Sequence, residues 1–265
     1  MKKYLALLKT YLGTIFTYRA NIIGTILLEL ISIGNIFILW AAVFRTHEEV
    51  HGITFQDTIA YYILVPLVGT ITNVTISDFR SKEIRTGELS RHLIKPYHLW
   101  TASFVEAVAQ KVVVILLVLP IYSAILISIE HSTDHSLFEL SQIIETAIIL
   151  IAAFMLHFFI DLAISWLAFW VSDIWSFSHF KIILFSVLGG LSFPFTLLSD
   201  PVRNILEKLP FQYFYYVPIQ YITNKEPCSH LTDDVKSILL WVILFTFIAF
   251  LLWKQGLKKY AAYGN

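Results

Sequence analysis

The chain has 265 residues, of which 57% are hydrophobic, and its 19 basic side chains balance its 19 acidic ones. A hydrophobic share this far above that of an average soluble domain predicts a membrane protein. The zero net charge identifies no partner by itself, because the charges are segregated along the chain, and we expect no nucleic acid among the partners. The single cysteine, Cys228, excludes an intramolecular disulfide.

The first 19 residues differ from the apolar runs that follow them. Their apolar side chains recur at helical spacing, and Lys2, Lys3 and Lys9 lie mostly off that stripe. This pattern predicts a helix over residues 1–19 that lies in the headgroup layer of a membrane. The alternative is a plain extension of the first membrane span, although Tyr18 and Arg19 favour a break.

Apolar runs long enough to cross a bilayer follow one another along the rest of the chain. A hydrocarbon core of about 30 Å needs about 20 apolar residues in helical form. Six such runs are predicted, at residues 20–44, 55–76, 102–129, 142–171, 181–198 and 237–253. The predicted fold is therefore an all-α, polytopic membrane protein with six transmembrane helices in a single domain, 1–265.

Basic residues are concentrated in alternate connections between these spans. Of the 19 Lys and Arg residues, 13 fall on one side of the predicted topology and five on the other. Basic connections stay in the cytoplasm, so both termini are predicted to be cytoplasmic. The segment 77–100 is then the most polar cytoplasmic stretch.

Segment 77–100 carries both signs of charge. Asp78 and Lys82 stand four residues apart, a spacing that supports a short helix through an ion pair. Gly87 permits a sharp turn, and Pro96 prevents a following helix from continuing. The residues predict a compact cytoplasmic projection, and a plain solvated loop is an equal alternative.

The connection 200–236 is too apolar for a free loop. Its apolar stretch is also too short, and too interrupted by Pro210 and Pro218, to span a bilayer. Short re-entrant or outer helices before the last span are predicted there, with a surface flap as the alternative.

In the fifth span, Gly189, Gly190 and Pro194 predict a kink. It is either a hinge or a place of close helix packing.

Ionisable residues stand inside the predicted spans, and those considered for a path are Glu29, Lys111, His157 and Asp161. Glu106 and Glu145 lie near span ends, where ion pairs or contact with the headgroup layer are expected. A charge in mid-membrane costs about 2.5–3.5 kcal/mol even on the lenient insertion scale, so these groups should face one another or a wet interior. His157 and Asp161 share a helix face because they are four residues apart. A polar translocation path or proton relay and a set of interhelical ion pairs are both open interpretations.

No motif for catalysis is present in the sequence. None of the glycines is followed by lysine, so the chain has no phosphate-binding loop, and it has no nucleophile elbow and no zinc-binding helix. We therefore predict that the chain is not an enzyme and has no catalytic residue, no metal and no cofactor of its own.

Two stretches resemble one known family. The first is Glu83-Ile84-Arg85-Thr86-Gly87-Glu88-Leu89 followed by Leu93-Ile94-Lys95-Pro96, and the second is the basic tail Trp253-Lys254-Gln255-Gly256-Leu257-Lys258-Lys259-Tyr260 with Gly264. Together with the topology, they resemble the bacterial type-2 ABC exporter permeases. The resemblance implies a membrane-spanning permease of an ATP-driven exporter in the bacterial cell membrane.

The resemblance also implies partners and roles. A separate ABC ATPase subunit would bind ATP and Mg²⁺, and a second permease chain, identical or related, would complete the path through the lipid bilayer. A cytoplasmic coupling helix would contact the ATPase, with mixed charges at the rim and Ile84 and Leu89 as apolar contacts. The implied coupling residues are Asp78, Arg80, Glu83, Ile84, Arg85, Gly87, Glu88, Leu89 and Arg91, with a second, smaller contact at Asp173 and Trp175.

Two other functions fit the same residues. An ion- or proton-coupled secondary transporter would use Glu29, Lys111, His157 and Asp161 as its coupling site. A non-transporting membrane scaffold would need neither a path nor an ATPase. The sequence does not identify the transported substrate.

Overall fold

The structure is a computed structural model. It describes residues 2–17, 19–45, 49–50, 53–130, 140–171, 174–223, 225 and 228–260. Almost all of them lie in helices, and the two short strands β1 (Glu49–Val50) and β2 (Ile53–Thr54) form a small antiparallel pair. The predicted all-α, polytopic architecture is confirmed.

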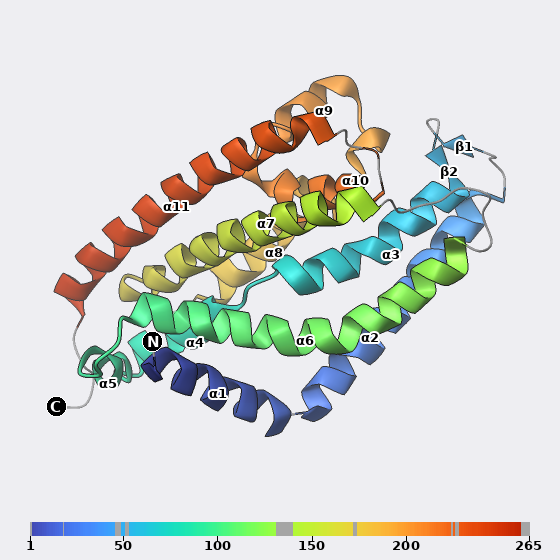
Figure 1. Ribbon diagram of the computed structural model, residues 1–265. Helices are drawn as coiled ribbons and strands as arrows, with labels where there is room; N and C mark the ends of the chain where they lie inside the picture. The colour runs from blue at the N-terminus through green and yellow to red at the C-terminus, as the bar shows by residue number, and fades with distance from the viewer. Residues whose placement is uncertain are drawn as a thin grey trace.

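Long helices run side by side along the molecule (Figure 1). In the described part of the chain, those of 18 residues or more are α2 (Arg19–Val43), α3 (Phe55–Thr72), α6 (Leu99–Glu130), α7 (Leu140–Trp166) and α11 (Leu231–Lys259). Four stretches among the described residues are long and apolar enough to cross a membrane, at 55–85, 99–124, 143–169 and 231–259. The count of six spans stays a prediction.

The fifth expected span, 181–198, is helical over only part of its length. Helix α8 (Trp175–Leu188) has 14 residues, or about 21 Å, which is shorter than a hydrocarbon core of about 30 Å. It ends where Gly189 donates to the carbonyl of Phe185 at 3.1 Å, and Gly190 follows with a φ of +88°. The kink that the glycines predicted is thus a helix end followed by a reversal of the chain.

The connection 200–236 folds into short helices that turn back into the bundle. They are η2 (Phe195–Leu197), α9 (Asp200–Leu206), η3 (Pro210–Phe214), α10 (Tyr216–Ile222) and η4 (Cys228–His230). Thr72, at the far end of α3 from β2, donates to the carbonyl of buried Phe214 at 3.4 Å. Since α3 is about 27 Å long, a contact with its last residue places η3 deep between the helices. This position is that of a re-entrant segment and not of a surface flap.

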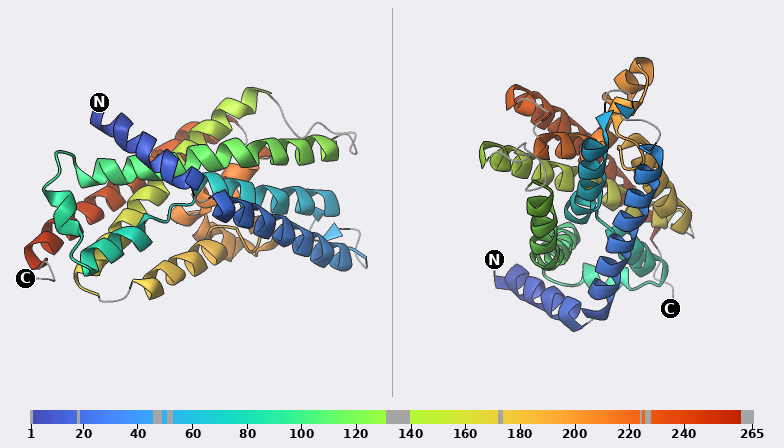
Figure 2. Two further views of the ribbon diagram at one scale, coloured as in Figure 1. Left: turned by 90° about the horizontal axis from the view of Figure 1, so that it is seen from below. Right: turned by 90° about the vertical axis from the view of Figure 1, so that its right-hand side faces the viewer.

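Helix α1 (Lys2–Thr17) is separate from α2 and packs across α6 (Figure 2). Lys3 anchors its first turn by donating to the carbonyl of Pro96 at 2.5 Å. The predicted N-terminal helix therefore exists as an element of its own. Its place in the headgroup layer stays a prediction.

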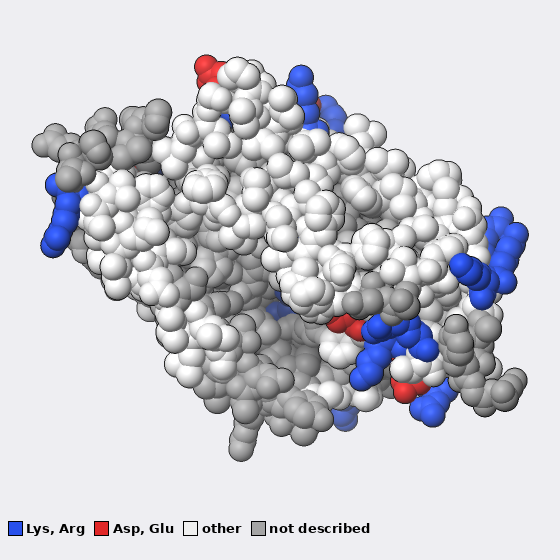
Figure 3. Space-filling view, turned by 180° about the vertical axis from the view of Figure 1, so that it is seen from behind, with Lys and Arg blue, Asp and Glu red and all other residues white. Residues whose placement is uncertain are grey.

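The start of α1 and the end of α11 lie at one end of the molecule (Figure 1). The short helices α4 (Ile76–Arg85) and α5 (Leu89–Leu93) lie there too, joined at Gly87, whose φ of +79° makes the sharp turn predicted from the sequence. We call this the basic end, because it carries the exposed residues Lys82, Arg85, Arg91, Lys95, Lys254, Lys258 and Lys259. On the face drawn in Figure 3, basic side chains gather toward it.

Candidate functional site

A carboxylate from another helix holds the start of α4. Asp161 on α7 is fully buried, and its Oδ2 accepts from the backbone N–H of Ser77 at 2.7 Å. Its Oδ1 accepts from the Ser77 hydroxyl at 2.9 Å. Ser77 is the second residue of α4, where backbone N–H groups lack partners within the helix and a negative charge is favourable. Asp161 thus performs for α4 the task of a capping side chain.

Lys181 brings α8 into the same cluster. Its ammonium group pairs with Asp161 and donates to the carbonyl of Val74, just before α4, at 3.0 Å. One turn earlier on α8, the Ser178 hydroxyl donates to Asp78 at 3.0 Å. The ion pair predicted between Asp78 and Lys82 is therefore not what Asp78 forms. We name Asp161, Lys181, Ser77, Asp78 and Ser178 the α4 anchor.

Arg80 forms a second buried network, although the resemblance implied that it contacts the ATPase. Its side chain is only 2% exposed, and its Nε donates to the Ser103 hydroxyl at 2.8 Å. Its terminal nitrogens pair with Glu83 at 2.6 Å and with Glu106 on α6. Arg80 is turned inward because α6 places a carboxylate opposite it, and these contacts fix α4 to α6.

Tyr11 carries this network to α1. Burial of its ring raises the pKa of the Tyr11 hydroxyl, and the charge of nearby Glu106 raises it further. The hydroxyl therefore stays protonated beside the Arg80–Glu106 pair. The network thus links α1, α4 and α6 at the basic end.

His92 on α5 extends the network to the chain before α6. Its Nε2 lies 3.1 Å from Glu83, and its Nδ1 lies 3.0 Å from the Tyr97 hydroxyl. Burial lowers the pKa of His92, against the opposing attraction of Glu83, and Arg80 and Lys95 lower it further. The neutral ring satisfies both contacts when Nε2–H donates to Glu83 and Nδ1 accepts from Tyr97.

Ile84 and Leu89, the apolar residues expected to touch the ATPase, are buried within the chain. Ile84 is 3% exposed and Leu89 0%, and both pack in the core around Trp166. Ile84 is buried because α4 packs on α7, and α5 contacts α4 beside it. Other apolar side chains of this region stay outside. The exposed ones are Phe79, Leu93 and Ile94, the last of them 86% exposed. Beside them Lys82, Arg85, Glu88 and Arg91 are exposed as well.

Trp175, predicted as part of a second contact with the ATPase, stands close to the exposed side of α4. It is 64% exposed at the start of α8, one turn before the Ser178 that bonds to Asp78. Its ring packs on His179 with a centroid separation of 3.9 Å. Asp173, its predicted companion, lies outside the described residues.

Of the predicted intramembrane residues, the structure describes the side chains of Lys111, His157 and Asp161. Lys111 donates to the carbonyl of Thr70 at 2.7 Å, and Asp161 belongs to the α4 anchor. His157 is buried between Phe185 and Phe214, at ring-centroid separations of 4.8 and 5.0 Å. The side chain of Glu29 lies outside the described part of the chain. Lys111 and Asp161 thus form interhelical contacts, and a translocation path or relay through these residues stays a prediction.

Sequence reasoning missed Lys181 as a partner of Asp161, because Lys181 stands at the edge of an apolar run, as the first residue of the predicted span 181–198. The signal was available, since a buried aspartate in a membrane requires a nearby cation. Among the residues that the structure describes, no group of three or more His, Cys, Asp or Glu could hold a metal ion.

The proposed hinge glycines occupy a crowded place. A Cβ on Gly190 would lie 2.8 Å from the Tyr61 hydroxyl, which donates to the Gly190 carbonyl at 2.5 Å, and 2.9 Å from Cβ of Tyr216. The structure therefore explains these glycines by close approach. A hinge motion at Gly189, Gly190 and Pro194 stays a prediction.

Gly190→Ala is expected to destabilise the protein. The left-handed backbone costs a non-glycine residue about 1–2 kcal/mol, and overpacking adds about 1–3 kcal/mol. Thermal unfolding in detergent measures the loss. Gly34→Ala is the control, because nothing lies within 4 Å of its added methyl group. An unchanged midpoint for Gly190→Ala would contradict the geometry at the end of α8.

Comparison with known families gives the decisive observation. The family model described as ABC-2 family transporter protein matches residues 30–264, nearly the whole chain. The chain belongs to the ABC-2 transporter family. No curated protein and no solved structure matches it. This ABC-2 protein is therefore a permease subunit of an ABC transporter, in a family of membrane transport subunits that associates with ABC ATPase subunits.

Proposed function

We propose that this ABC-2 permease forms half of the membrane part of an ATP-driven exporter in a bacterial cell membrane, with both termini in the cytoplasm. A separate ABC ATPase subunit, which binds ATP and Mg²⁺, docks on α4, α5 and the start of α8. The observation that carries this proposal is the two-sided character of α4. One side is fixed by buried ion pairs, and the other presents exposed charges and apolar groups.

A docking element that transmits force has to be rigid with respect to the helices that it moves. The α4 anchor joins α4 to α7 and α8, and the Arg80 network joins it to α6 and α1. A displacement imposed on the exposed side of α4 is therefore transmitted to four other helices. A solvated loop, the alternative weighed from the sequence, has no such attachments.

The contact surface that we propose differs from the one implied by the resemblance. Phe79, Leu93 and Ile94 supply the apolar contact, in place of buried Ile84 and Leu89. Lys82, Arg85, Glu88 and Arg91 form the charged rim, and Trp175 supplies the second contact. Asp78, Arg80, Glu83 and Gly87 act as supports of this surface.

A second permease chain completes the path in this proposal. Figure 3 shows a hollow on the face turned away from Figure 1, with atoms of a basic side chain inside it. A second chain facing this hollow would convert it into an enclosed passage. Movement of α8 by the ATPase would then act on the walls of that passage, because the end of α8 meets the re-entrant segment through the bond of the Tyr216 N–H to the Gly189 carbonyl at 3.0 Å.

Charge reversal on the rim tests this assignment. Arg85→Glu/Arg91→Glu is expected to abolish co-purification of the ATPase with the permease and to remove permease-dependent ATP turnover. The thermal midpoint of the permease should stay unchanged, because both side chains are exposed. Lys236→Glu is the matched control. Lys236 is exposed in the first turns of α11, whereas the basic residues Lys258 and Lys259 stand in the last turn of that helix. Full turnover in the double variant would contradict the proposed docking surface.

A further inference from the structure

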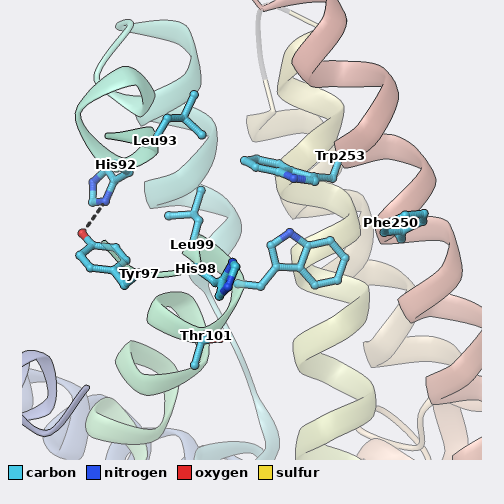
Figure 4. Close-up of a pocket in the computed structure, with 9 residues that line it drawn as sticks. His92, Leu93, Tyr97, His98, Leu99, Thr101, Phe250 and Trp253 are labelled. Atoms are coloured by element: carbon cyan, nitrogen blue, oxygen red, sulfur yellow. Dashed lines mark hydrogen bonds between the residues drawn. The ribbon is translucent and has the colours of Figure 1, made fainter. Parts of the chain in front are cut away.

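A cavity of about 510 Å³ opens at the basic end, between the first turn of α6 and the last turns of α11. Figure 4 shows Tyr97, His98 and Thr101 on one side of the opening and Phe250 and Trp253 on α11 across it. The hydrogen bond between His92 and Tyr97 closes its edge toward α5. Of the residues that line the cavity, the proposed ATPase surface uses Leu93 alone.

The walls of the cavity are polar on one side and apolar on the other. The His98 imidazole and the Thr101 hydroxyl are exposed, and neither hydrogen-bonds to another side chain or backbone group of the described residues. Opposite them, Phe250 presents half of its surface, and Trp253 lies beside it. A ligand that fills this space needs a polar group joined to an apolar one.

The two segments that form the walls carry charge of a single sign. Residues 91–101 and 250–259 contain no Asp or Glu, and they contain five exposed basic residues: Arg91, Lys95, Lys254, Lys258 and Lys259. Lys254 follows the lining residue Trp253 directly, and Lys95 precedes Tyr97 by two positions. This one-sided charge favours an anionic polar group near the membrane surface.

The position of the cavity along the helices matches the headgroup layer of a membrane. Trp100 and Trp253 both line it and both stand at ends of apolar helices, where tryptophan prefers the headgroup layer. From there α11 continues as an apolar face, with Leu240, Ile243, Phe247 and Phe250 exposed along it. Acyl chains lying on this face would bring their headgroup to the cavity.

We propose that this cavity binds the phosphate headgroup of an anionic phospholipid, with its acyl chains along the exposed side of α11. The His98 imidazole and the Thr101 hydroxyl hydrogen-bond to the phosphate, and Lys254 supplies the opposite charge. Because His92 and Leu93 of α5 also line the cavity, a bound lipid would tie α5 to α11. The cavity meets the proposed ATPase surface at Leu93, but lipid binding is measured without the ATPase and does not depend on it.

Quenching of tryptophan by brominated lipids tests the proposal, since two tryptophans line the cavity. The purified full-length chain in neutral detergent is titrated with brominated phosphatidylglycerol and, separately, with brominated phosphatidylcholine. We expect saturable quenching by the anionic lipid at a lower mole fraction than by the zwitterionic one. Trp100→Phe/Trp253→Phe should remove that difference and leave the shared background. Equal quenching by both lipids would overturn the proposal.

Substitutions separate the site from general attraction to the membrane. Lys254→Gln is expected to weaken anionic-lipid binding about fivefold, the effect of one basic residue near a lipid surface, and adding His98→Ala should weaken it further. Lys236→Gln, at the other end of α11, should change nothing. Equal affinities for Lys254→Gln and the parent chain would contradict the site. Displacement of the brominated lipid by inorganic phosphate would assign the cavity to free phosphate and overturn the lipid assignment.

Discussion

Asp161→Ala is expected to lower the free energy of unfolding by about 3–5 kcal/mol, the cost of breaking a buried ion pair by removing one partner. The substitution leaves the Lys181 ammonium buried without its counter-charge and removes the acceptor of both Ser77 hydrogen bonds. Thermal unfolding of the purified permease measures the loss. Because the start of α4 is released as well, permease-dependent ATP turnover should fall in the protein that remains folded.

Two variants distinguish the ion pair from a general effect of charge removal. Asp161→Leu/Lys181→Met removes both charges and should recover part of the lost stability, since an apolar pair of similar volume replaces a buried ion pair at little cost. Asp233→Ala, which breaks the exposed pair with Lys236, should leave the midpoint unchanged. A midpoint for Asp161→Ala equal to that of Asp233→Ala would show that Lys181 does not depend on Asp161.

Arg80→Ala is the second substitution with a large expected effect. It leaves the carboxylates of Glu106 and Glu83 without their shared guanidinium group, and we expect a loss of about 3–5 kcal/mol. Arg80→Lys should recover only part of it, because an ammonium group cannot reach Ser103, Glu83 and Glu106 in the planar geometry of the guanidinium. Thermal unfolding of both variants gives the comparison.

Arg85→Ala is the matched control for Arg80→Ala, five residues along the same helix but exposed. We expect its stability to stay within about 0.5 kcal/mol of the parent chain, as at most surface positions, while ATP turnover in the complex falls. The two variants would then distinguish a residue that holds α4 in place from a residue that contacts the ATPase. If Arg80→Ala lowered turnover without lowering stability, Arg80 would be a contact residue, as the resemblance implied.

The sequence predicted the elements better than the direction of their side chains. Spans, the turn at Gly87 and the re-entrant connection follow from local apolar length, glycine and proline. The orientation of Arg80 does not, because it depends on Glu106, which stands 26 positions away. The capping of α4 likewise depends on Asp161, 84 positions from Ser77. Pairings across such distances leave no periodicity in a single sequence.

At the end of α8, the prediction from the sequence differs from the structure for another reason. Adjacent glycines inside an apolar run indicate a kink or close packing, and both readings assume that the helix continues. The structure shows a helix end because the Gly189 carbonyl accepts from the N–H of Tyr216 at 3.0 Å instead of from the next turn of its own helix. That donor belongs to the re-entrant segment, which local sequence could place only approximately.

The alternative of an ion- or proton-coupled carrier loses support on the same evidence. Its proposed coupling residues Lys111 and Asp161 are engaged with Thr70 and with Lys181 and Ser77, and the family to which the chain belongs transports with ABC ATPases. Asp161 serves in our account to position α4. A scaffold without transport would have no need of a rigidly anchored surface at the basic end.

Accessibility of Arg85 tests the central claim most directly, because the account requires the exposed side of α4 to face the cytoplasm and the ATPase. Cys228 is the single cysteine, so Cys228→Ser/Arg85→Cys carries one thiol at that surface. We predict that a membrane-impermeant thiol reagent labels it in inverted membrane vesicles but not in intact cells, and that the ATPase subunit protects it. Labelling in intact cells would contradict the account.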